Sequence, residues 1–243
     1  MLVLALDTTA RTGSVALAED GRMLDLLEGD PGRPHAERMP SDLLRVLSRQ
    51  GRTLLQVDLF AVAIGPGSFT GLRIGIAAIQ GCAFAAGRPV IGVSALEALA
   101  QAAPGARGGG PLPIVGVWMD AQRQEVFSAL YRRDEAVAPA RLAALDGPSV
   151  GDPGEIAERW AELAGQAGFP IVGDGAVRYA RQLEQAAGAP VEIVAPPILA
   201  PTIAILAWRR ALAGERPAPH AVRPLYVRRP DAELARDRRH QAL

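Results

Sequence analysis

The 243-residue chain contains no lysine, so every basic side chain apart from three histidines is an arginine. The absence of lysine excludes a Walker-type phosphate loop, a pyridoxal Schiff base and a lysine general base. The 26 basic residues balance 26 acidic ones. No net charge draws the chain as a whole toward nucleic acid or an anionic membrane, so any contact with nucleic acid must be local or shared with a partner.

Cysteine and histidine are also scarce. Cys82 is the one cysteine, so the chain can form neither an internal disulfide nor a multi-thiolate metal site. His35, His220 and His240 show no pairing at three- or four-residue spacing, which predicts no bound metal. The N-terminus lacks the pattern of a signal peptide, and no run reaches the ~20 apolar residues that span a bilayer. We expect a cytoplasmic protein without membrane contact.

Hydrophobic patterning and turn residues predict alternating strands and helices in the first half of the chain. Three strands come first as a meander, because Asp20-Gly21 is a hairpin signal. A capping box from Ser94 to Glu97 opens the last helix of this half. The expected strands are residues 2–6, 14–18, 22–27, 59–64 and 90–93, and the other expected helices are 39–50 and 70–86.

A Pro- and Gly-rich stretch at 104–113 predicts a linker, after which the hairpin pattern restarts. The second half is therefore a variant of the first, and the fold class is α/β with two similar subdomains. We expect subdomains at 1–106 and 107–217, and an Arg-rich tail at 218–243 that is frayed or docked on a partner. The expected strands of the second half are 114–119, 125–131, 171–172 and 191–194, and its expected helices are 154–167, 176–187 and 202–213.

The sharpest local motif runs from Gly65 to Gly75 and reads GPGSFTGLRIG. Its glycines permit positive backbone dihedrals, and the helix that starts here offers unpaired N–H groups. The spacing matches neither the dinucleotide motif nor a Walker loop. Two interpretations remain: a phosphate-binding turn, or a tight turn with a purely structural role.

The helix expected at 70–86 is apolar on all sides and therefore needs cover on all sides. The cover is either the chain's own core or the surface of another protein. Gly71 and Gly75 place bare backbone four residues apart, which invites the close approach of another helix.

Asp7 and Asp120 each end an apolar strand and enter a hairpin at matching places of the two halves. They could face one cleft and hold a magnesium ion or a water molecule. The alternative is that both are turn-forming aspartates whose carboxylates cap local N–H groups. The chain has no G-x-S-x-G elbow, and Ser68 has no evident base nearby.

Several blocks of sequence together resemble the TsaB family. These are Leu4–Thr9 with Ser14–Leu17, the Gly65–Gly75 motif, Ile91–Leu96, Met119–Ala121 with Glu125–Phe127, and Pro224–Arg228. The resemblance implies the fold of the actin, sugar-kinase and heat-shock ATPase group, with two ribonuclease-H-like halves. It agrees with the duplication of a strand-first unit.

The resemblance also implies a non-catalytic role without a cofactor. In TsaD, the catalytic relative, a metal-binding His-x-x-x-His pair occupies the places held here by Ala95 and Leu99. The implied function is to bind TsaD, with the ATPase TsaE as a third partner, and to support transfer of threonylcarbamoyl from threonylcarbamoyl-adenylate to an adenosine of tRNA. Contact with tRNA would be indirect or through the complex.

The first two helices form the implied contact surface, which would pair two copies when the chain is alone. Ile76→Asp is then expected to abolish pairing and leave a folded monomer. The alternative function is an ATPase or small-molecule kinase that uses Asp7 and Asp120; a metallopeptidase is disfavoured by the missing His pair. The expected interface residues are Leu43, Leu44, Leu47, Leu72, Ile76, Ile79 and Ala83, and the residues expected for residual phosphate or nucleotide binding are Asp7, Thr8, Thr9, Gly65, Gly67, Ser68 and Asp120.

Overall fold

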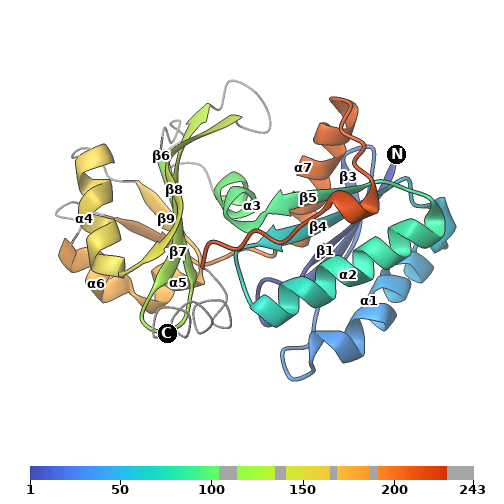
Figure 1. Cartoon of the computed structure of the whole chain (residues 1–243), viewed down its shortest axis with the longest axis horizontal. Helices are drawn as coiled ribbons and strands as arrows, with labels where there is room; N and C mark the ends of the chain where they lie inside the picture. The colour runs from blue at the N-terminus through green and yellow to red at the C-terminus, as the bar shows by residue number, and fades with distance from the viewer. Residues whose placement is uncertain (104–113, 135–140, 165–168, 187–190, 229–243) are drawn as a thin grey trace, which may run out of the picture.

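Each half of the chain forms its own five-stranded sheet. The computed structural model describes residues 1–103, 114–134, 141–164, 169–186 and 191–228 (Figure 1). We call the part built on the first sheet the first lobe and the part built on the second sheet the second lobe. The linker expected at 104–113, the ends of two expected helices at 165–167 and 187, and the tail beyond 228 lie outside the described residues.

The two sheets have the same topology. The first has the order β3-β2-β1-β4-β5, with an antiparallel meander followed by two parallel strands, and the second repeats it as β8-β7-β6-β9-β10. The predicted duplication and mixed sheets are confirmed. The strands are β1 Leu2–Asp7, β2 Ser14–Glu19, β3 Arg22–Glu28, β4 Leu59–Gly65, β5 Val90–Ser94, β6 Ile114–Asp120, β7 Val126–Asp134, β8 Arg141–Gly151, β9 Pro170–Val172 and β10 Glu192–Val194.

Helices cover both faces of the first sheet, and successive side chains of a strand point to opposite faces. In β1, Leu4 packs with α1 and α2 on one face, whereas Val3 and Ala5 pack with α3 and α7 on the other. The continuous apolar run of β1 follows from this burial on two faces. The helices are α1 His35–Arg49, η1 Leu54–Gln56, α2 Phe69–Ala86, α3 Ala95–Ala102, α4 Pro153–Ala164, α5 Asp174–Arg178, α6 Ala180–Ala186, α7 Ala200–Leu212 and η2 Pro219–Ala221.

The core beneath α3 and α7 joins the two lobes. It includes Val117 and Phe127 of the second sheet together with Val3 and Ala61 of the first. The helix α3 lies between the sheets in Figure 1 and contacts β6, β7 and β8 as well as β4 and β5. A separate core under α4, α5 and α6 centres on Trp118 and Trp160.

The helix α7 follows the second sheet in the chain but packs on β1, β2, β4 and β5 of the first. The expected subdomain of residues 107–217 includes this helix, so the expected boundary at residue 106 separates α7 from the sheet that it covers. Ser14 contributes to the attachment, because its Oγ accepts a hydrogen bond from the Ala200 N–H at 3.2 Å.

Four local predictions need correction. The first helix begins at His35 rather than 39, with Pro40 inside it, and the helix expected at 176–187 is broken at Tyr179 into α5 and α6. The strand β8 was not predicted, because its sequence contains Gly147-Pro148 and lacks regular alternation. Ser94 caps α3, but Glu97 forms an ion pair with Arg210 instead of completing a capping box.

Within the described part of the chain, α2 is the one helix that could cross a bilayer by length and composition, with a mean hydropathy of 1.4. A core helix of a soluble fold meets the same criterion. One side of α2 packs against β4 through Leu72, Ile76 and Ile79.

Candidate functional site

A cleft of about 1080 Å³ lies between the lobes, where β1 and β6 end. Asp7 and Asp120 both line this cleft, as one of the two interpretations of the sequence allowed, together with Thr9 and the turn from Pro66 to Thr70. Thr8 and Gly65 are not among the lining residues. The cleft therefore brings together most, but not all, of the residues expected to bind phosphate or nucleotide.

The carboxylate of Asp7 accepts hydrogen bonds from the loop that follows it. Its Oδ1 accepts hydrogen bonds from the N–H of Thr9 at 2.8 Å and from the Thr9 hydroxyl at 2.6 Å. The side chain is only 2% exposed, and this burial raises the pKa of Asp7, against the opposing effect of the two hydrogen bonds from Thr9. This is the geometry of a turn-forming aspartate.

Asp120 makes the equivalent turn in the second lobe. Its Oδ1 accepts from the N–H of Gln122 at 3.0 Å, two residues on, as Asp7 does for Thr9. Its Oδ2 forms an ion pair with Arg178 at 2.6 Å. Burial, and secondarily the Asp120 charge, raises the pKa of Tyr179, whose hydroxyl lies 3.4 Å from Asp120. Both aspartates thus cap local N–H groups, so the turn-forming alternative accounts for the geometry of each.

The glycines of the Gly65–Gly75 motif pack against the β1–β2 loop. A Cβ added at Gly67 would lie 2.8 Å from Thr9 Cβ, one at Gly71 would lie 2.5 Å from the Thr8 carbonyl, and one at Gly75 would overlap the Thr8 hydroxyl. Ser68 Oγ accepts from the Gly71 N–H at 3.3 Å and caps α2. These glycines make room for Thr8 and Thr9, which supports the structural interpretation of the motif.

A buried arginine that the sequence reading missed fixes the same loop. Arg38 pairs with Asp42 at 2.9 Å, and both side chains are buried. Its guanidinium also donates to the Thr12 carbonyl and contacts His35, whose Nε2 lies 3.1 Å from the Ala10 carbonyl. Burial, followed by the Arg38 charge, lowers the pKa of His35. The i,i+4 spacing of Arg38 and Asp42 was the available signal, but the expected helix began one residue too late to include Arg38.

The structure corrects the expected interface. Six of its seven residues are buried in the chain's own core, and Leu44 alone of them is exposed, at 60%. The reason is geometric: α2 packs Leu72, Ile76 and Ile79 onto the first sheet and also contacts α1, η1 and η2, so these three residues face inward. Ile76→Asp therefore cannot be expected to leave a folded monomer.

Different residues form the solvent-facing side of α1 and α2, which lie side by side in Figure 1. Ala77, Gly81 and Phe84 share one exposed stripe of α2 at i, i+4 and i+7, and Phe84 is 83% exposed. With Leu44 of α1 they form what we call the outer helix face. Its four residues are apolar, and none of them lines the cleft.

The positions of the metal-binding pair in TsaD do not fit a metal here. Ala95 and Leu99 are apolar and buried in the core that joins the lobes. Nowhere in the described ranges do three or more His, Cys, Asp or Glu side chains cluster as a metal site would require.

Comparison with known proteins gives the family. A family model described as TsaD: tRNA N6-adenosine threonylcarbamoyltransferase matches residues 30–235. YeaZ from Pseudomonas aeruginosa has a solved structure that is 33% identical, with 93% of this chain and 99% of that chain covered and a TM-score of 0.74. The chain belongs to the TsaD family and is a TsaB/YeaZ-like member of it.

One further relative agrees with this TsaB/YeaZ-like assignment, and one solved structure shares the fold. The tRNA threonylcarbamoyladenosine biosynthesis protein TsaB of Escherichia coli (strain K12) is 41% identical over 135 residues, which are 56% of this chain and 57% of that protein. The chain thus matches little more than half the length of that relative. A glucokinase from an Antarctic psychrotroph is 11% identical with a TM-score of 0.50, over 86% of this chain and 99% of that one, and shows the shared fold alone.

The raised pKa of Asp7 leads to a test of its role. Protonated Asp7 stabilises the fold below the pKa that it has in the unfolded chain, and this stabilisation is lost as pH rises through the raised pKa of the folded state. Asn keeps an acceptor for Thr9 but does not titrate. We expect Asp7→Asn to be more stable than the wild type at about pH 8 and to lose this advantage near pH 4, as measured by denaturant unfolding.

The control is Asp7→Ala, which lacks the acceptor and should be less stable than Asp7→Asn at both pH values. An Asp7→Asn variant that is less stable than the wild type at about pH 8 would show that the fold needs the charged carboxylate.

Proposed function

We propose that the chain is a non-catalytic subunit that binds TsaD, with TsaE as a third partner. In this role it supports transfer of threonylcarbamoyl from threonylcarbamoyl-adenylate to an adenosine of tRNA. The observation that carries the proposal is the outer helix face, because Leu44 and Phe84 are large apolar side chains left in water on adjacent helices. Exposed apolar surface of this kind is typical of protein–protein contacts.

Gly81 supports this use of the face. Among the described residues no atom lies within 4 Å of the position that a Cβ at Gly81 would take. A glycine inside a helix costs about 1 kcal/mol relative to alanine. The fold of the single chain gives no compensating contact, whereas a partner helix that packs closely on the bare backbone would.

The cleft supports a non-catalytic role. Asp7 and Asp120 are engaged by their own loops, and the glycines that could cradle a phosphate are covered by Thr8 and Thr9. A nucleotide would have to displace these contacts. An ATPase or small-molecule kinase remains the second candidate, because both aspartates line one cleft; ATP turnover that is lost in Asp7→Ala would favour it.

The remaining parts of the proposal concern assembly. Alone, the chain would pair with a second copy through the outer helix face. Leu44 and Phe84 of both copies, which are exposed to water in the single chain, would then be buried in the interface. We place the protein in the cytoplasm, where tRNA is modified. Its balanced charge supports contact with tRNA through the complex rather than alone.

The decisive measurement is light scattering on a sizing column, with the chain alone and then mixed with TsaD of the same organism. We expect a heterodimer peak, and we expect Phe84→Asp to weaken pairing by roughly 30-fold or more, the effect of losing ~2 kcal/mol at an interface hot spot. The variant should stay folded because position 84 lies in water.

The matched control is Leu212→Asp, which places the same charge at an exposed leucine of α7, away from the outer helix face. It should pair with TsaD as the wild type does. The proposal fails if wild-type chain and folded TsaD give no complex with nucleotide and TsaE present, or if Phe84→Asp pairs normally.

A further inference from the structure

The last described segment of the chain connects the two lobes. We call residues 217–228 the C-terminal strap; it includes η2 and then runs in extended form. Figure 1 shows it, in orange-red, passing from the lobe that holds α2 to the lobe that holds β7. Its final residues, from Leu225 to Arg228, line the cleft.

The strap is fastened along the first lobe by backbone and side-chain hydrogen bonds. Val90 of the edge strand β5 donates its N–H to the Pro217 carbonyl at 3.2 Å, and Gln80 Nε2 donates to the Pro219 and Val222 carbonyls at 2.8 and 3.1 Å. Leu225 donates its N–H to the Ile64 carbonyl at 2.7 Å. Val222 is buried in the core of the first lobe.

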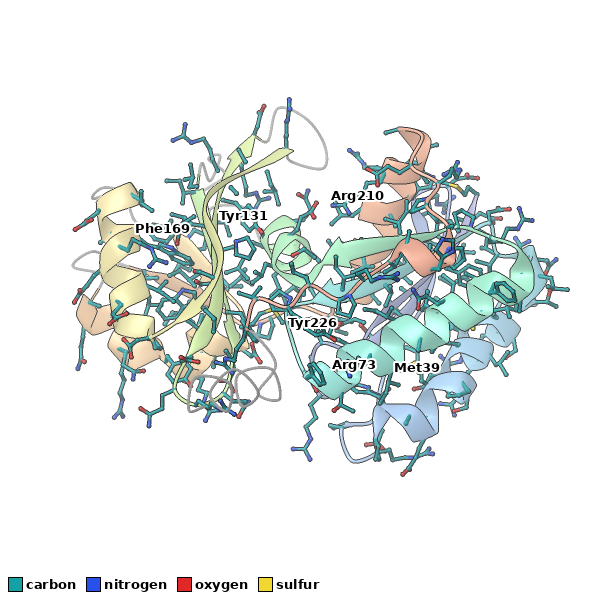
Figure 2. The ribbon with its side chains drawn as sticks, in the orientation of Figure 1. Met39, Arg73, Tyr131, Phe169, Arg210 and Tyr226 are labelled. Carbon is teal, nitrogen blue, oxygen red and sulfur yellow. The ribbon has the colours of Figure 1, made fainter. Side chains whose placement is uncertain are left out.

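A stack of side chains fixes the strap to the N-terminal end of α2. Tyr226 and Phe69 stack with their ring centres 5.3 Å apart, and the Arg73 guanidinium lies 3.9 Å from the centre of the Phe69 ring. Arg73 Nε donates to the Tyr226 hydroxyl at 2.9 Å. Figure 2 shows Arg73 and Tyr226 facing each other between α2 and the strap. Cation–π contact and stacking favour this one arrangement.

Two residues later the strap is fastened to the second lobe. Arg228 Nη1 donates to the Ala121 carbonyl at 2.7 Å, and Nη2 pairs with the Glu125 carboxylate. The guanidinium also lies 5.5 Å from the centre of the Phe127 ring. One side chain thus attaches to both ends of the β6–β7 turn and to the strand that follows it.

That turn holds an unfavourable backbone. Gln122, Arg123 and Gln124 have φ of 60°, 55° and 62°, in the left-handed region that favours glycine. Strained backbone persists where surrounding contacts hold it. Asp120 holds the turn at Gln122, and Arg228 holds it at Ala121 and Glu125.

In the described structure the chain itself crosses between the lobes from β10 to α7, and two further sets of contacts join them. One is the core around α3, which packs on both sheets, and the other is the strap, which has attachments to the two lobes only two residues apart, at Tyr226 and Arg228. Without the strap, the core around α3 and the connection from β10 to α7 alone would set how the lobes are oriented. We propose that the C-terminal strap is a latch that holds the cleft at one opening and the β6–β7 turn in its strained form, with Arg228 as the catch.

The test measures the distance between the lobes in the full chain. Nitroxide labels are placed at Arg22→Cys on β3 and Glu158→Cys on α4, two exposed sites outside the outer helix face, in a Cys82→Ser background. Dilution with unlabelled chain removes distances between copies. Pulsed electron paramagnetic resonance should give one narrow distribution of label-to-label distances for the chain with Arg228. In Arg228→Ala, the population at other label-to-label distances should rise several-fold.

Arg223→Ala is the matched control, since Arg223 lies in the same strap and donates to strap carbonyls at His220 and Val222. It should keep the narrow distribution. Glu125→Ala removes the carboxylate that pairs with Arg228. It should broaden the distribution of label-to-label distances as Arg228→Ala does. Amide exchange at residues 122–125 should speed up in both, because the turn is released.

The latch is disproved if Arg228→Ala and Glu125→Ala keep the distance distribution and amide exchange of the parent chain, or if the parent chain is already broadly distributed. Far-UV circular dichroism confirms that each variant is folded. The outcome is independent of pairing with TsaD, because no partner is present in the experiment.

Discussion

Ile76→Asp should unfold the protein rather than free it from a partner. Ile76 is 4% exposed and packs in the core between α2 and the first sheet. An unpaired charge at a buried site costs roughly 3–5 kcal/mol, a large part of the 5–15 kcal/mol that stabilises a typical domain. We expect a shift of the denaturant midpoint by roughly half or more, or loss of soluble protein.

The matched control lies one residue further along the same helix. Ala77 faces solvent, so Ala77→Asp should cost only the lower helix propensity of Asp, about 0.7 kcal/mol. It lies on the outer helix face, however, and should weaken pairing with TsaD. A folded, stable Ile76→Asp variant would contradict the burial of this side of α2.

Gly75→Ala should be damaging although it is a conservative substitution in a helix. The added Cβ would overlap the Thr8 hydroxyl and would lie 3.1 Å from Thr8 Cγ2. Thr8 cannot easily move, because the neighbouring Asp7 and Thr9 are joined by two hydrogen bonds. Overpacking of this kind costs typically about 1–3 kcal/mol, which urea unfolding measures directly.

A double-mutant cycle identifies the clash. Thr8→Ala removes the two nearest atoms, and the Thr8 hydroxyl is buried with no hydrogen-bond partner among the described residues, so its loss alone should cost little. The pair Thr8→Ala with Gly75→Ala should recover most of the stability lost in Gly75→Ala.

Gly81→Ala serves as the control for helix propensity. It should stabilise the free chain by up to about 1 kcal/mol, since nothing occupies the space. If Gly75→Ala is also stabilising, or if Thr8→Ala gives no rescue, the packing of the β1–β2 loop on α2 is not as described.

The architecture could be predicted from sequence because it depends on local patterns. The apolar run Leu2–Leu6, the hairpin signal Asp20-Gly21 and the repeat of the strand-first pattern led to the correct sheets apart from β8. The strand β8 was not predicted, because Gly147-Pro148 interrupts its sequence pattern. In the structure its pairing with β7 nevertheless continues past a bulge. Pairing with a neighbouring strand overrode the local signal.

The side chains of the candidate site were harder to interpret, because composition does not say which face of a helix is covered. The sequence of α2 is apolar on all sides, so Ile76 and Phe84 could not be told apart until the sheet fixed which one turns inward. The glycines of the Gly65–Gly75 motif likewise depend on Thr8 and Thr9, which are distant in sequence. Only Asp7 and Asp120 carried a local signal, the strand followed by a turn, that placed them correctly at the cleft.

The position of α7 affects how the chain can fold during synthesis. Ile203, Ala204 and Ala207 cover one face of the first sheet, yet they are translated after every strand of the second. As the chain leaves the ribosome, Val3 and Ala5 on that face lack the cover of α7 until about 200 residues have emerged, because α7 begins at Ala200. The lobe that is made first is thus finished last, and a nascent chain stalled between the lobes would expose an apolar sheet face to chaperones.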